Sequence, residues 1–196
     1  MRWRRAGGSD GNEQLTALLA TVLLVLLAIE GATLLDLRAL LTVHAFVGML
    51  LIPPIVVKLA SVGWRTSRYY LGAAEYVRRG PPHIVLRAVI APVIGVSTVA
   101  LFGTGVALLA RDQTEGSLLA LHQASFIVWI GATSLHVLGH LLELPRAVRL
   151  RASGLPARVA LVGSALALGL GVATLTLPAA DHLQDSATAH VGIDGD

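Results

Sequence analysis

Four histidines lie in apolar stretches of the chain: His44 in one stretch, and His122, His136 and His140 together in a later one. An ionisable side chain is costly to bury in lipid, so each of the four is a candidate for function. Imidazole is the commonest protein ligand for metal ions, iron among them. In an α-helix, fourteen or eighteen residues return a side chain to within about 40° of its starting direction. The three later histidines are therefore predicted to share one stripe of a helix.

The composition indicates a membrane protein. Of the 196 residues, 55% are hydrophobic and only 14% are charged, whereas about a quarter are charged in a soluble domain. The mean hydropathy is +0.72, and several apolar runs exceed the ~18 residues that mark a membrane span. We predict an all-α integral membrane protein with five transmembrane helices, at about 15–35, 39–62, 84–110, 117–143 and 157–178.

These spans form a single predicted domain, residues 1–178, in which the first four make a four-helix bundle. The first span ends without a small-residue cleavage site, so we interpret it as a retained helix rather than a signal peptide. Residues 179–196 are polar and are predicted to form a disordered tail, in which His182 and His190 receive no role.

The basic residues predict the orientation. If five helices cross in alternation, thirteen of the fifteen Lys and Arg residues fall on one side, and only Arg38 and Arg111 fall on the other. The positive-inside rule then places the N-terminus in the cytoplasm and the C-terminus outside. Because the charges sit in short loops between apolar runs, topology explains them and no nucleic-acid partner is expected. An excess of arginine over lysine, with many Ala, Leu, Val and Gly residues, favours a bacterial cell membrane.

Two of the histidines are predicted to lie at the same depth in the membrane. His44 and His122 each lie about five residues into spans that enter the membrane from the same predicted side. At about 1.5 Å per residue, both lie ~7–8 Å below the outer boundary. Two histidines at one depth on parallel helices can ligate the two faces of a haem iron. The chain has no cysteine, so thiolate ligation, iron–sulfur clusters and covalent haem attachment are excluded.

This pattern resembles the bacterial b-type cytochrome superfamily, namely the membrane cytochrome b subunits of hydrogenases and formate dehydrogenases and the small quinol-linked cytochromes b. The resemblance covers residues 15–143 and rests on a membrane helix with histidines fourteen apart and a partner histidine on an earlier helix. It implies a four-helix bundle that holds haem b without a covalent bond and exchanges electrons between a quinone pool or a partner redox subunit and an acceptor. His44 and His122 would be the outer ligands, and Phe46, Phe126 and Trp129 are candidates for packing on the porphyrin.

The resemblance also implies a second, inner haem on His136 or His140. Lys58, fourteen residues after His44, and Arg87 are candidate partners for haem propionates. The sequence departs from the superfamily here, because the cytoplasmic end of the first span has no histidine. One haem is therefore expected and a second stays open. No Ser–His–Asp set, Walker loop or dinucleotide fingerprint is present, so we expect an electron-transfer subunit rather than a stand-alone enzyme.

Two other interpretations remain. His136 and His140 form an HxxxH pair, which suits a zinc, copper or nickel site in a membrane metal-binding or transport protein. Alternatively, the chain is a cofactor-free scaffold whose histidines only bond across helices. Neither interpretation explains why His44 and His122 lie at one depth.

Overall fold

A computed structural model of the chain describes residues 8–78, 89–140, 145 and 153–193, and every regular element in these ranges is helical. Five helices are long and apolar enough to cross a membrane, which confirms the predicted number of spans. They are α1 (Gly8–Thr33), α2 (Leu41–Tyr70), α4 (Ala91–Arg111), α5 (Ser117–His140) and α7 (Leu155–Ile193), with the short helices η1 (Leu34–Asp36) and α3 (Ala74–Val77) between them.

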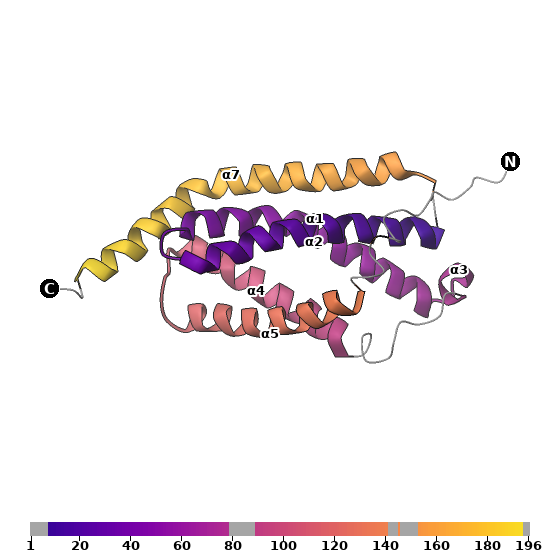
Figure 1. The fold of residues 1–196 in the computed structure, drawn as a ribbon, viewed down its shortest axis with the longest axis horizontal. Helices are drawn as coiled ribbons and strands as arrows, with labels where there is room; N and C mark the ends of the chain where they lie inside the picture. The colour runs from indigo at the N-terminus through magenta and orange to yellow at the C-terminus, as the bar shows by residue number, and fades with distance from the viewer. Residues whose placement is uncertain (1–7, 79–88, 141–144, 146–152, 194–196) are drawn as a thin grey trace.

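Helices that follow one another in the sequence pack in pairs, and these pairs join into one bundle (Figure 1). Helices α1 and α2 contact each other across the η1 turn, and α4 contacts α5 across residues 112–116. Asp112 ends α4 in the left-handed conformation, with φ 49°, which lets the chain reverse at once. Helix α7 packs along α2 and also contacts α1 and α4, so the fifth helix is an integral part of the bundle.

The end of the chain differs from its prediction. Residues 179–193 were expected to be a disordered tail, but α7 continues through them to Ile193. A helix of 39 residues is about 58 Å long, nearly twice the ~30 Å hydrocarbon core. Pro178 lies inside this helix, and Figure 1 shows its yellow C-terminal part turning toward the other helices, as expected at a proline.

The continuation of α7 is stabilised by packing that its polar composition did not reveal. Ala180 and Leu183 are buried against Leu109 of α4, with apolar side chains of α2 around them. Gln184 accepts a hydrogen bond from the Thr42 backbone N–H at 3.0 Å. Burial on one face and a cap for α2 together offset the entropy of ordering this segment.

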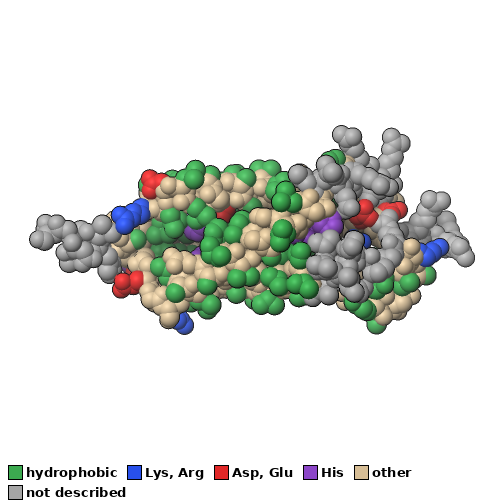
Figure 2. Space-filling view, turned by 60° about the horizontal axis from the view of Figure 1, so that its bottom comes forward, with side chains coloured by type: hydrophobic (Ala, Val, Ile, Leu, Met, Phe, Trp, Pro, Cys, Tyr) green, Lys and Arg blue, Asp and Glu red, His purple; other side chains and the backbone are tan. Residues whose placement is uncertain are grey.

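The core and the surface both fit a bilayer. Leu23 of α1 and Val47, Leu51 and Ile55 of α2 form a buried cluster. Much of the outer surface is also apolar, as for Leu175, which is 83% exposed. In Figure 2 hydrophobic side chains are spread over the whole middle of the molecule, and the visible charged ones lie mainly toward its two ends. Lipid would cover this apolar surface in a membrane.

Candidate functional site

A cavity of about 1060 Å³ lies between α1, α2, α4 and α5. Its size is at the upper end of the ~300–1,000 Å³ usual for small-molecule and cofactor sites. Most of its lining is apolar, and α7 contributes Leu183, Ala187 and Thr188 at one end. Its polar lining residues are few, and they include Glu30, Arg38, His44, Gln113, Glu115, His122, Gln123 and Thr133. The sequence-predicted pair His44 and His122 is therefore brought to one cavity.

His44 lies in the first turn of α2, and its ring is held from α1. Its Nδ1 lies 2.9 Å from Thr33 Oγ1 and 3.1 Å from Glu30 Oε1. The Thr33 hydroxyl donates its own proton to the Glu30 backbone carbonyl at 2.6 Å, so it accepts from the imidazole. Nδ1 of His44 therefore carries the proton, and Nε2 keeps a free lone pair.

His122 on α5 is held in the same tautomer by different groups. Its Nδ1 lies 3.1 Å from the Leu101 carbonyl oxygen, which can only accept, and 3.1 Å from Thr104 Oγ1. The Thr104 hydroxyl donates to the Ala100 carbonyl at 2.7 Å. A Cβ at Gly105 would lie only 3.2 Å from His122 Cε1, so the absence of a side chain there lets the imidazole rest on α4.

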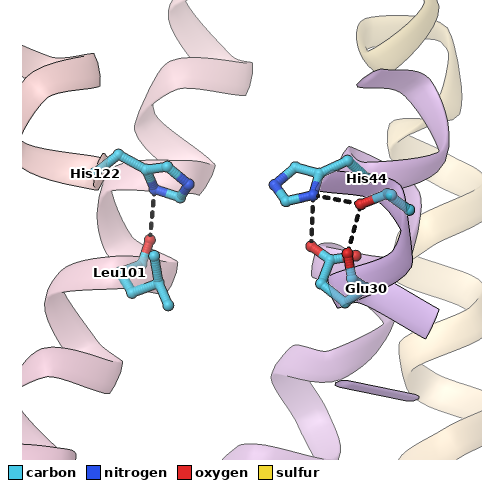
Figure 3. Close-up of polar contacts among 5 residues, drawn as sticks. Glu30, His44, Leu101 and His122 are labelled. Atoms are coloured by element: carbon cyan, nitrogen blue, oxygen red, sulfur yellow. Dashed lines mark hydrogen bonds and ion pairs between the residues drawn. The ribbon is translucent and has the colours of Figure 1, made fainter. Parts of the chain in front are cut away.

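The two rings point toward one another across open space (Figure 3). In each, Nδ1 is turned back to its supporting helix and the other ring nitrogen is turned toward the opposite histidine. Neutral imidazoles whose Nε2 lone pairs face one another are the kind of donors that a metal ion such as iron accepts. Ligating histidines almost always donate their second N–H to a carboxylate or backbone carbonyl, as both do here. The donor set fits an iron porphyrin with an imidazole on each face.

The apolar lining fits a flat, apolar cofactor. Phe126 and Trp129, two of the candidates for packing on a porphyrin, line the cavity, and Trp129 Nε1 is fixed by a 3.0 Å hydrogen bond to Thr98 Oγ1. Phe46 instead packs against the buried cluster of α1 and α2. Glu30 and Thr133, two residues of the lining, each have a buried side-chain oxygen, Oε2 and Oγ1, with no hydrogen-bond partner among the described residues. Buried atoms of this kind call for a ligand or a water molecule.

The inner candidates form a separate group. The rings of His136 and His140 lie 4.7 Å apart between centroids, but neither residue lines the cavity. Lys58 does not line it either, and its Nζ donates to the Thr16 carbonyl oxygen at 3.2 Å. His136 and Lys58 are close enough to interact electrostatically. Arg87 lies outside the described residues.

A second haem on His136 or His140 would need further ligands from elsewhere in the bundle. Within the described ranges there is no group of three or more His, Cys, Asp or Glu side chains that could hold a metal ion. The i, i+4 pair on α5 is brought together by the helix itself.

Glu30 is the site residue that the sequence reasoning missed. It lies inside the predicted first span, near the end that meets His44. The general rule that an ionisable residue in a span is a functional candidate would have found it. The Leu101 carbonyl carries no sequence signal, because any residue would supply it.

The chain was compared with protein families, curated proteins and solved structures. No protein-family model, no curated protein and no solved structure matches the chain. The cavity itself offers two imidazole nitrogens, a buried carboxyl group at Glu30 and, in its lining, the guanidinium of Arg38.

Proposed function

We propose that the chain is a membrane b-type cytochrome that holds one haem b between His44 and His122. The observation that carries the proposal is the facing pair of imidazoles, each fixed through Nδ1 so that Nε2 points into a cavity of cofactor size. Haem bound there would supply one-electron transfer. The partners that fit this function are a quinone pool or a redox subunit at one end and an acceptor at the other.

The remaining lining residues have defined roles in this proposal. Phe126 and Trp129 would exclude water from the faces of the ring, and the apolar walls would keep the local dielectric low. Arg38 lines the same cavity and would pair with the propionate groups, because arginine binds carboxylates in a bidentate way. Lys58, predicted for this role, does not line the cavity.

The proposal is limited to one haem. The inner pair His136 and His140 comes from a single helix, and bis-histidine ligation requires one imidazole on each face of the porphyrin. In the part of the chain that the structure describes, the alternative for these two residues is a weak two-ligand metal site, which their 4.7 Å ring separation supports. Metal analysis of the purified protein, with and without His136→Ala, tests that alternative directly.

The deciding experiment is a reduced-minus-oxidised visible spectrum of the detergent-purified protein, with haem per chain from the pyridine haemochrome. We expect a b-type α-band and about one haem per chain. His44→Ala and His122→Ala should each lose it, whereas the matched control His182→Ala, outside the cavity lining, should keep it. A colourless wild-type protein from cells supplied with haem would contradict the proposal.

A further inference from the structure

Glu30 is an acid on the apolar helix α1, and it lines the cavity beside His44. Its side chain is 16% exposed, and Oε1 lies 3.1 Å from His44 Nδ1. Oε2 is buried without a partner among the described residues. No lysine or arginine of the described part of the chain forms an ion pair with it, since its ion-pair partner there is His44. A buried carboxylate without a permanent counter-charge is destabilising unless something compensates it.

A cation held on the far nitrogen of His44 would supply that compensation. Nδ1 of His44 lies 2.9 Å from Thr33 Oγ1 and 3.1 Å from Glu30 Oε1, and Nε2 of the same ring faces the cavity. Ferric haem with two neutral ligands carries one net positive charge at the iron and porphyrin, and ferrous haem carries none. A carboxylate one imidazole away therefore stabilises the oxidised state more than the reduced state.

His122 lacks such a group. Its Nδ1–H is directed to the neutral carbonyl of Leu101 and to the Thr104 hydroxyl. A hydrogen bond to a carboxylate raises the basicity of a ligating imidazole more than one to an uncharged acceptor. The two ligands thus differ in strength although they have the same tautomer.

We propose that Glu30 is a positioning residue that makes His44 the stronger of the two ligands and lowers the reduction potential of the bound haem. This inference rests on the proposed function and assigns a control of that function to one side chain. Thr33 and Glu30 together fix the orientation of the ring, and of the two only Glu30 can add negative charge to it.

The test is a potentiometric titration of haem in wild type, Glu30→Gln and Glu30→Leu. Glutamine keeps the size and an oxygen acceptor but removes the carboxylate, so this variant tests whether the negative charge of Glu30 sets the haem potential. We expect full haem in Glu30→Gln and a potential raised by at least ~59 mV, a tenfold change in the one-electron equilibrium constant. Glu30→Leu should raise it further. Low-temperature EPR of the ferric state should show altered g values in both variants.

The matched control is Asp36→Asn, which removes a carboxylate that does not line the cavity and keeps an oxygen acceptor for the Ala39 backbone N–H. Its potential should stay close to wild type. If Glu30→Gln binds full haem with the wild-type potential and EPR spectrum, the inference is wrong and the cytochrome proposal stands. If the wild type binds no haem, both fall. Should Glu30→Gln not accumulate, Glu30→Asp, which withdraws the carboxylate by one methylene, should change the potential in the same direction.

Discussion

The two halves of the bundle treat polar side chains in opposite ways. In the half that contains the cavity, His44 and His122 bond backward to their supporting helices and leave one nitrogen each facing open space. In the half that contains Lys58, polar groups bond to one another. Asn12 donates to Ser61 at 3.1 Å, Thr16 and Ser61 share a 2.8 Å hydrogen bond, and Arg158 donates to Gln14 at 2.8 Å.

This difference separates a binding site from a structural network. Polar groups that bond to each other across helices add stability and specify packing, even where one atom, Asn12 Oδ1, has no partner among the described residues. Polar groups that are fixed in place but keep an unused lone pair are available to a ligand. Polarity within a membrane span therefore does not identify a site by itself, and the direction of the unused atoms does.

The largest expected effect is the loss of haem binding when the histidines of the cavity half are replaced. His44→Ala and His122→Ala remove the inward-facing nitrogens, so each should abolish stoichiometric haem binding. The double variant His136→Ala/His140→Ala removes imidazoles that do not line the cavity and should retain haem near the wild-type ratio. Haem per chain measures both. Loss of half the haem in the double variant would instead establish a second, inner haem.

The next effect concerns how His122 is seated. A side chain at position 105 collides with the imidazole, since even a Cβ would lie 3.2 Å from His122 Cε1. Gly105→Val should lower haem occupancy several-fold by displacing the ring. Gly103→Val is the matched control, because a Cβ at Gly103 of the same helix meets nothing within 4 Å. Equal occupancy in the two variants would show that the seating of His122 on α4 is unimportant.

The opposite half should respond in stability rather than in haem content. Ser61→Ala removes the hydroxyl that Asn12 and Thr16 both contact. Hydrogen bonds between membrane helices average about 0.6 kcal/mol, so we expect a loss of roughly 1 kcal/mol and a lower melting temperature. The haem ratio and potential should not change. A shift in either would show that the two halves are coupled.

The sequence predicted the number of helices and the pair of histidines, because both depend on regular spacing. Apolar runs reveal spans through length alone, and equal depth on parallel helices follows from 1.5 Å per residue. It did not reveal the helical end of α7, since Leu183 and Ala180 become informative only when α2 and α4 are beside them. Nor did it reveal which histidines face a cavity. That distinction depends on helix rotation, which hydropathy does not fix when lipid and core are both apolar.

The smallest expected effect lies where α7 meets the cavity half. Gln184 accepts from the Thr42 backbone N–H in the first turn of α2 and donates to the Arg38 carbonyl oxygen. It thus caps the helix end that carries His44, and loss of a cap costs about 0.5–2 kcal/mol. Gln184→Ala should therefore release haem to a scavenger faster than wild type while binding the same amount at equilibrium. Thr188→Ala, which lines the cavity but bonds only to the Asp185 carbonyl within α7, is the control. If both variants release haem at the wild-type rate, the end of α7 covers the cavity without stabilising its ligand.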